Sequence, residues 1–222
     1  MAQRLALFDL DNTLLAGDSD HAWGEFLIAK NLVDESEHRR ENDRFYQQYR
    51  EGKLDIHGYV KFTLQPILTL DGEQRQALHD QFMQDTITNL YLSKADVLVR
   101  QHQDAGDFTI IITATNEFIT RPIAKRFAVD QLIATDLETE SGFFTGNILG
   151  TPCYQAGKVT KLQAWLTAHS PDLHIGDAIF YSDSINDVAL LQIVDHPVAV
   201  DPDARLRVEA EARGWPVISL RR

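Results

Sequence analysis

Two aspartates directly after a short apolar segment are the residues of this chain whose types and spacing most clearly suggest chemistry. Residues 5–8 have the length of a buried strand, and Asp9 and Asp11 follow them, with Asn12 and Thr13 behind. Because residues i and i+2 of an extended chain lie on the same side, Asp9 and Asp11 can face one pocket. Neighbouring carboxylates repel each other unless a cation or a shared proton separates them. We therefore expect a site at this strand end.

The order Asp-x-Asp-x-Thr in residues 9–13 resembles the first motif of the haloacid dehalogenase superfamily of aspartate-nucleophile phosphatases. Three further segments match that family in the expected order along the chain. They are the β-branched segment 108–113, the segment 157–162 with a lysine at the start of a helical pattern, and the acidic loop 182–187. Each motif alone is weak evidence, but together they cover the chain from residue 5 to residue 187.

The resemblance implies a role for each polar residue of these motifs. Asp9 would attack phosphorus and form an aspartyl-phosphate. Asp11 would protonate the leaving alcohol and then activate water, which requires a pKa above the ordinary value of about 3.9. Thr113 would donate its hydroxyl to a phosphate oxygen, Asn186 would orient the phosphate side, and Lys158 would neutralise charge on the transferring phosphoryl group.

The resemblance also implies a Mg²⁺ site. Asp9, Asp183 and the backbone carbonyl of Asp11 would be the direct ligands, and Asp187 would support them from the ligand shell. Mg²⁺ prefers few carboxylates, several waters and the substrate phosphate, which suits such an open site. The chain departs from the family pattern at Ser182, because many relatives have Gly before the first aspartate of this loop.

Strand and helix patterns alternate in the second part of the chain, and the first part is helical. Alternation favours an α/β fold, a doubly wound Rossmann-like parallel sheet, with ligands beyond the carboxyl ends of the strands. The expected strands are 108–113, 131–134, 178–182, 197–200 and 216–220, with a hairpin at 139–150. The expected helices of this part are 95–103, 121–127, 159–169, 188–193 and 205–213. Residues 16–92 show helical patterns, including 56–64 and 73–90.

The helical block resembles the cap insertion of the phosphoserine-phosphatase-like branch of the superfamily (subfamily IB). The resemblance predicts a core domain of residues 1–15 and 93–222 and a helical cap domain of residues 16–92. A lid beside the nucleophile can close over the substrate and exclude water.

The resemblance makes the cap the determinant of substrate choice. Asp18 matches the cap acid that holds the ammonium group of phosphoserine, whereas Thr63, with Lys61 nearby, matches the arginine that holds its carboxylate. A substrate with an ammonium group and no carboxylate would fit better, and the first motif looks like that of bacterial members assigned to L-histidinol phosphate. Asp18, Asp20 and Glu25 could then face its ammonium and imidazole groups.

Composition limits the partners that the protein can have. There are 21 Lys and Arg against 33 Asp and Glu, and the net charge of −12 opposes binding to nucleic acid or anionic lipid. A small phosphorylated metabolite is also an anion, so a cation and a lysine must reverse the potential inside the cleft. The single cysteine excludes an internal disulfide, and no segment is long and apolar enough to cross a bilayer. We expect a cytoplasmic location and neither nucleic acid nor membrane as a partner.

Three other classes of protein share single features with these motifs. A calcium loop of the EF-hand type begins Asp-x-Asp, but Leu14 and Asp20 stand where Gly and Glu would be required. Receiver domains also use aspartates and Mg²⁺, but they are shorter and lack a helical insertion. A non-catalytic phosphate-binding protein should lack the second acid or the lysine. Phosphoserine phosphatase and phosphotransfer to an alcohol acceptor remain open alternatives.

Overall fold

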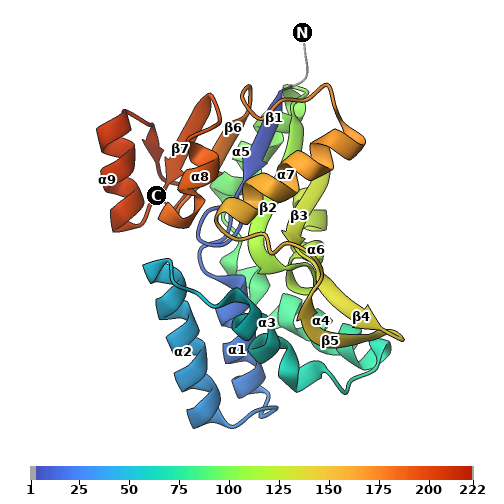
Figure 1. Cartoon of the computed structure of the whole chain (residues 1–222). Coiled ribbons are helices and arrows are strands. Elements are labelled where there is room, and N and C mark those ends of the chain that lie inside the picture. Colours follow the sequence, from blue (N-terminus) through green and yellow to red (C-terminus); the bar gives the residue numbers. More distant parts are fainter. Residues whose placement is uncertain (1–3, 222) are drawn as a thin grey trace.

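A six-stranded parallel sheet forms the centre of the protein, seen in a computed structural model that describes residues 4–221 (Figure 1). The strands are β1 (Leu5–Phe8), β2 (Phe108–Asn116), β3 (Gln131–Thr135), β6 (Ile179–Ser182), β7 (His196–Val200) and β8 (Val217–Ile218), and β4 (Leu137–Glu140) and β5 (Phe143–Ile148) form a separate antiparallel pair. The helices are α1 (Ser19–Ala29), α2 (Glu35–Glu51), α3 (Ile56–Leu64), α4 (Gly72–Asp85), α5 (Ser93–Asp104), α6 (Glu117–Phe127), α7 (Ala156–His169), α8 (Val188–Leu191) and α9 (Ala204–Arg213). Short 3₁₀ turns occupy Gln65–Ile67, Ile87–Leu90 and Ile185–Asp187. The predicted doubly wound α/β class is confirmed.

The strand order β3-β2-β1-β6-β7-β8 decides where a ligand can bind. From β1 the chain builds outward through β2 to β3, and it then crosses to β6 and builds outward on the other side. The direction reverses between β1 and β6, where Phe8 pairs with Tyr181, and open α/β sheets bind ligands beyond the strand ends at such a point. Asp9 and Asp183 follow these two strands, so both lie at that edge.

Alternating residues of β1 separate two apolar layers. Ala6 and Phe8 pack in the cluster that includes residues of α5 and α6, whereas Leu5 and Leu7 pack in the cluster that includes residues of α7, α8 and α9. All four side chains are buried, as expected for a central parallel strand covered on both faces. This double burial holds the end of β1 firmly in place.

Helices α1 to α4 form a helical insertion beyond the carboxyl ends of the strands, at the lower end of the view in Figure 1. Each helix begins after an aspartate whose carboxylate accepts backbone N–H groups of the first turn: Asp18, Asp34, Asp55 and Asp71. The two segments that join the insertion to the sheet lie side by side. Leu15 and Tyr91 form an antiparallel bridge, and Ala16 N–H donates to Leu90 O at 2.8 Å.

The predicted boundaries of β2, α6 and α4 were wrong. Strand β2 continues to Asn116 instead of ending at Thr113, and α6 begins at Glu117 instead of residue 121, because the Asn116 side chain accepts Ile119 N–H and caps the helix. The helix predicted at 73–90 ends at Asp85, and the chain then makes a 3₁₀ turn. Thr113 therefore lies inside a strand that continues toward the site.

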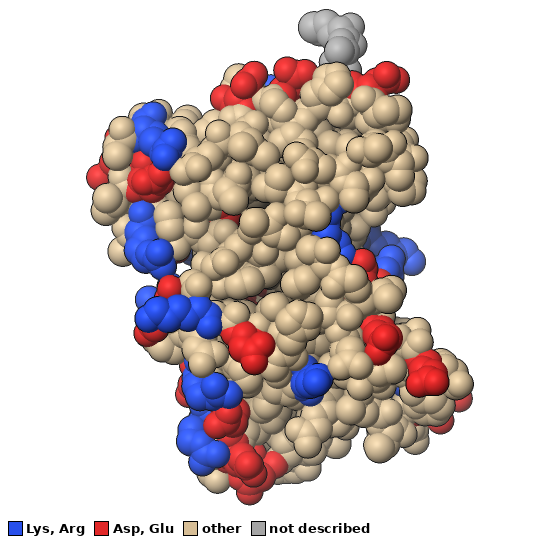
Figure 2. Space-filling model, in the orientation of Figure 1, with Lys and Arg blue, Asp and Glu red and all other residues tan. Residues whose placement is uncertain are grey.

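Acidic and basic side chains are interspersed on the surface. On the face in Figure 2 the blue residues along the left edge alternate with red ones, and no continuous basic stripe crosses this face. Among residues 4–221, no helix is long and apolar enough to span a membrane. The expected absence of nucleic-acid and membrane partners, like the expected cytoplasmic location, stays a prediction.

Candidate active site

Lys158 joins the carboxylates that follow β1 and β6. Its Nζ lies 2.7 Å from Asp9 Oδ1 and 2.7 Å from Asp187 Oδ2, and all three side chains are almost completely buried. Lys158 stands in the first turn of α7, which packs against β2 and β3. Burial lowers the pKa of Lys158, but Asp187 and Asp9 outweigh this effect and raise it above its ordinary value. The lysine is therefore a permanent cation beside Asp9.

Thr13 connects Asp9 with Asp183. The Thr13 hydroxyl lies 3.4 Å from Asp9 Oδ2 and 3.3 Å from Asp183 Oδ1, and it accepts Asp183 N–H at 3.0 Å. Burial raises the pKa of Asp183 well above its usual range, and the charges of Asp9 and Asp187 raise it further. The carboxylates of Asp9 and Asp183 thus face a common point where negative charge accumulates. A cation at that point would relieve the repulsion.

Asp11 is held by partners from the insertion and from β2. Its Oδ1 accepts the backbone N–H of Ser19 at 2.7 Å, and its Oδ2 accepts the hydroxyl of Thr115 at 2.7 Å. Burial raises the pKa of Asp11 to about 7, with a further contribution from the charge of Asp18. A carboxyl group with this pKa can both give and take a proton near neutral pH.

Ser182 and Thr113 contribute hydroxyl groups beneath the site. Ser182 Oγ donates to Asp187 Oδ2 at 2.7 Å and accepts Ser184 N–H at 3.2 Å, so serine fixes the carboxylate that holds the lysine. Ser182, which stands where many relatives have glycine, is therefore accommodated by its hydrogen bond to Asp187. Thr113 Oγ1 accepts Thr115 N–H at 3.2 Å, and its own proton can be donated toward the pocket that it lines.

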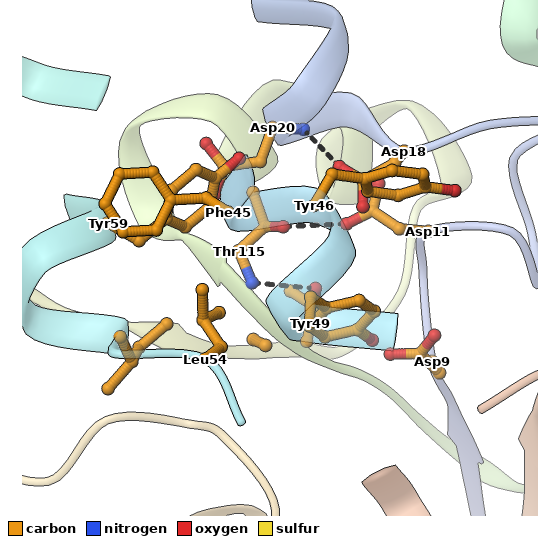
Figure 3. A pocket seen from close by; sticks show the side chains of 13 residues that line it. Asp9, Asp11, Asp18, Asp20, Phe45, Tyr46, Tyr49, Leu54, Tyr59 and Thr115 are labelled. Atoms are coloured by element: carbon orange, nitrogen blue, oxygen red, sulfur yellow. Dashed lines mark hydrogen bonds between the residues drawn. The ribbon is translucent and has the colours of Figure 1, made fainter. Parts of the chain in front are cut away.

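A pocket runs from the two catalytic candidates into the insertion (Figure 3). Aromatic and aliphatic side chains of α2, α3 and the segment between them form one wall, and acids form the other. The lining comprises Asp9, Asp11, Asp18, Asp20, Phe45, Tyr46, Tyr49, Leu54, Ile56, Tyr59, Thr113, Ala114 and Thr115. None of these thirteen residues is a lysine or an arginine. An anionic group on the leaving-group side would find no cationic partner in this lining.

The acids predicted to bind substrate are used in different ways. Asp18 Oδ1 accepts Asp20 N–H at 3.0 Å and His21 N–H at 2.8 Å, so this oxygen caps α1. Asp20 is 5% exposed, and its Oδ1 has no hydrogen-bond partner among the residues that the structure describes. Burial raises the pKa of Asp20 well above the ordinary range, and Asp18 adds to the shift. Glu25 is absent from the pocket lining and pairs with Arg39 at 3.2 Å, contrary to the expectation that it faces the substrate.

Thr63 and Lys61 also lie outside the pocket lining. Thr63 is buried, with its hydroxyl donating to Val60 O at 3.1 Å, and Lys61 is exposed. The expectation that this position faces the substrate is therefore corrected: α3 presents Tyr59 to the pocket instead, one turn earlier. The pocket lining contains no arginine that could hold a substrate carboxylate.

Comparison with known proteins identifies the family. The family model described as haloacid dehalogenase-like hydrolase matches residues 6–192. The chain belongs to this family. It is 45% identical over 221 residues to a protein of Neisseria meningitidis serogroup C (strain 8013) named histidinol-phosphatase, covering 99% of this chain and 100% of that protein.

Two solved structures resemble this haloacid dehalogenase-like hydrolase. A protein of unknown function from Bordetella pertussis Tohama I has a TM-score of 0.91 at 43% identity, covering 99% of this chain and 100% of that one. A substrate-bound phosphoserine phosphatase has a TM-score of 0.71 at 15% identity, covering 98% of this chain and 93% of that one, and shares the fold. The family and its named relatives indicate that this hydrolase is a phosphatase.

Three side chains of the hydrolase core hold the C-terminal end of α2 against the site. Asn186 Nδ2 donates to Tyr49 O at 2.8 Å, Arg205 Nη1 donates to Glu51 O at 3.2 Å, and Gln155 Nε2 donates to Gly52 O at 3.1 Å. The free space in the pocket is about 30 Å³, which is room for about two water molecules. These contacts hold the insertion close over the site in this structure.

Several residues of the site were not predicted from the sequence. Thr115 binds Asp11, and the alternation that places Thr113 and Thr115 on one side of β2 could have identified it. Tyr46 and Tyr49 are three apart, which places both on one side of α2 and was a usable signal. No local pattern indicated that Tyr59 of α3 would line the same pocket as these two tyrosines.

Proposed function

We infer that this phosphatase is a Mg²⁺-dependent phosphomonoester hydrolase that acts through an aspartyl-phosphate on Asp9, with L-histidinol phosphate as substrate. The observation that carries this inference is the composition of the pocket. The pocket joins Asp9 and Asp11 to two further acids, Asp18 and Asp20, and to aromatic rings, without any lysine or arginine in its lining. Such a pocket suits a leaving group that is cationic and partly flat.

The residues around Asp9, Lys158 and Asp183, here called the floor of the pocket, fit a magnesium ion. Asp9, Asp183 and the backbone carbonyl of Asp11 would hold it, and the Thr13 hydroxyl lies within 3.4 Å of Asp9 Oδ2 and 3.3 Å of Asp183 Oδ1, so its one proton can serve either carboxylate. Among the described residues no group of three or more His, Cys, Asp or Glu side chains forms a ready metal cage. Two carboxylates and a carbonyl agree with the preference of Mg²⁺ for several waters and a substrate phosphate as its remaining ligands. When bound, the ion would offset negative charge on the phosphoryl oxygens.

The first half of the reaction transfers the phosphoryl group to the protein. An oxygen of the Asp9 carboxylate forms a bond to phosphorus while the bond between phosphorus and the leaving alkoxide breaks. Asp11 gives its proton to the alkoxide oxygen, so the alcohol leaves neutral. Lys158, 2.7 Å from Asp9 Oδ1, stays charged and stabilises the negative charge that gathers on the phosphoryl oxygens. Thr113 and Asn186 would orient those oxygens.

The second half returns Asp9 to its free state. Asp11, now a carboxylate, takes a proton from water, and the water oxygen attacks phosphorus. The bond between phosphorus and Asp9 breaks, and inorganic phosphate is released. The hydrogen bonds of Asp11 to Ser19 and Thr115 hold the carboxyl group in one orientation for both transfers. Its pKa of about 7 supports this double role.

Residues 16–92 act as a cap in this proposal, and residues 1–15 and 93–222 form the core. The adjacent connecting segments at Leu15 and Tyr91 support this division, because they would let the insertion move as a unit. The first turn of α1 also reaches Asp11 through Ser19 N–H, so closing the cap would complete the environment of the general acid.

Phosphoserine is a poorer candidate for the same site. Its carboxylate would enter a pocket that already contains four acidic side chains and no cationic one in its lining. L-Histidinol phosphate carries an ammonium group in the same relation to the phosphate and an imidazolylmethyl group in place of the carboxylate. The name of the relative from Neisseria meningitidis, which is 45% identical, supports this choice.

The test is Mg²⁺-dependent phosphate release from L-histidinol phosphate, phosphoserine and p-nitrophenyl phosphate. We expect the highest kcat/KM for L-histidinol phosphate, and an equal or higher value for phosphoserine would overturn the substrate assignment. In Asp9→Asn we expect kcat to fall at least about a thousandfold, the scale seen when a covalent nucleophile is removed. Asp195→Asn, at an exposed acid, is the matched control. Retained turnover in Asp9→Asn would exclude the covalent mechanism.

A further inference from the structure

Asp20 differs from the other acidic residues of the pocket lining in its hydrogen bonding. Its side chain is 5% exposed and lines the pocket, and its Oδ1 has no hydrogen-bond partner among the described residues. The N-terminus of α1 does not supply one, because the nearby backbone N–H groups of Asp20 and His21 donate to Asp18 instead. Buried polar groups normally have partners. An orphan carboxylate oxygen that lines a binding pocket therefore indicates a partner that arrives with the ligand.

The surroundings of Asp20 indicate what that partner is. Phe45 of α2 and Tyr59 of α3 line the same pocket, with their ring centroids 5.2 Å apart and an interplanar angle of 46°. Figure 3 shows Asp20 beside these rings, with Asp9 at the opposite end of the view and Asp11 and Thr115 between them. Aromatic faces attract cations, and flat groups pack well against them. A carboxylate next to two rings suits a planar cation at the end of the pocket that is distant from phosphorus.

We propose that Asp20, Phe45 and Tyr59 form a subsite for a planar cationic ring on the leaving group, an imidazolium, and that Asp20 selects its charge. The subsite is built by α1, α2 and α3 and contains no residue of the core. It rests on the proposed function only in that the ring belongs to the phosphomonoester being cleaved. Asp18, with one oxygen engaged in capping α1, is left to meet an ammonium group closer to the phosphate.

Three phosphomonoesters separate these roles. L-Histidinol phosphate carries the ring and the ammonium group, phosphoethanolamine carries only the ammonium group, and p-nitrophenyl phosphate carries neither cation. In Asp20→Asn we expect KM for L-histidinol phosphate to rise about thirtyfold or more, the scale for truncating a buried charge partner. KM for the other two substrates should change less than about threefold. An equal rise for all three would overturn the proposal, because it would show a structural role for Asp20.

Matched variants keep the result interpretable. Asp18→Asn retains an N-cap residue while removing the charge. We expect it to raise KM for L-histidinol phosphate and for phosphoethanolamine by the same factor. Tyr59→Leu removes the ring face and should raise KM for L-histidinol phosphate alone. A Tyr59→Leu enzyme with unchanged KM for that substrate would exclude the aromatic wall from recognition.

Inhibition separates the subsite from the identity of the substrate. L-Histidinol should inhibit hydrolysis of p-nitrophenyl phosphate competitively, and Asp20→Asn should raise its inhibition constant about thirtyfold. This holds even if L-histidinol phosphate proves not to be the preferred substrate, in which case the proposed function fails and the subsite stands. Inhibition that is equal in the two enzymes would overturn the subsite while leaving the phosphatase mechanism intact.

Discussion

The two ends of the pocket differ in how their charged groups are partnered. At the floor, Asp9 and Asp187 each lie 2.7 Å from Lys158, and Ser182 donates a further hydrogen bond to Asp187. At the far end, Asp20 has a buried oxygen without a hydrogen-bond partner among the described residues. The floor is built by strand ends and α7 of the core, whereas the far end is built by helices of the insertion.

This difference follows from the two tasks of a phosphatase. Phosphoryl transfer needs the same charges in the same places for every phosphomonoester, so the floor can be ordered in advance. Recognition of the leaving group gains most from groups that are unsatisfied until the substrate arrives, because the substrate then supplies the missing partner. We therefore expect substitutions at the floor to affect all substrates and substitutions at the far end to affect selected ones.

After Asp9→Asn, the largest effect at the floor is expected for Lys158→Met. The variant loses the cation beside Asp9, so kcat should fall about a hundredfold for every substrate. It also leaves two buried carboxylates without their partner, and the free energy of unfolding without Mg²⁺ should fall by about 3 kcal/mol. The control is Lys161→Met on the same helix, whose partner Asp136 is 46% exposed, so that its carboxylate stays hydrated when the lysine is lost. There the loss should stay below about 1 kcal/mol, and equal losses would contradict an ordered floor.

Gly157→Ala should misplace the lysine without removing it. A Cβ at Gly157 would lie 2.1 Å from the backbone oxygen of Pro152, so the first turn of α7 must shift and carry Lys158 with it. We expect kcat to fall about tenfold for all substrates, since small displacements of catalytic groups are costly. Gly176→Ala is the control, because a Cβ there meets no atom within 4 Å. A fall in kcat for only some substrates would contradict the expectation that substitutions at the floor affect all of them.

Arg205→Ala tests the contact between the two regions and should have a smaller effect. The variant loses the hydrogen bond from Arg205 to Glu51 O, which holds the end of α2 near the site. One such bond contributes about 1 kcal/mol, so we expect KM to rise about fivefold with little change in kcat. Arg207→Ala, at an exposed residue two positions later, should leave KM unchanged. A change in kcat alone would mean that Arg205 does not act through cap closure.

Cys153 tests whether the apolar cluster on the α7 side of the sheet stays closed in the native protein. It is fully buried in the apolar cluster beneath α7, and burial raises its pKa to about 12. A raised pKa keeps the thiol protonated, and therefore unreactive, at pH 8. We expect no alkylation by iodoacetamide at pH 8 in the native protein, with or without Mg²⁺, and complete alkylation in denaturant, measured by mass spectrometry. Modification of the native protein would show that the core opens.

Local patterns were sufficient for the fold class and for the floor. Alternation of strand and helix signals predicted the parallel sheet, and the i, i+2 spacing of Asp9 and Asp11 predicted that both would reach one pocket, as they do. The end of β2 was predicted three residues too early, because polar residues after Thr113 resemble a loop in sequence while they are buried in the strand. Thr115 was missed for the same reason.

The sequence by itself determined which groups are available at the strand ends, because strand alternation and motif order are properties of neighbouring residues. Only the tertiary structure decided the different roles of the acids of the insertion. Asp18 caps a helix, Glu25 pairs with Arg39, and Oδ1 of Asp20 has no hydrogen-bond partner among residues 4–221. The physical reason is that the faces of α1, α2 and α3 that meet are set by packing between residues far apart in the chain. That packing also decides which carboxylate is buried and which is solvated.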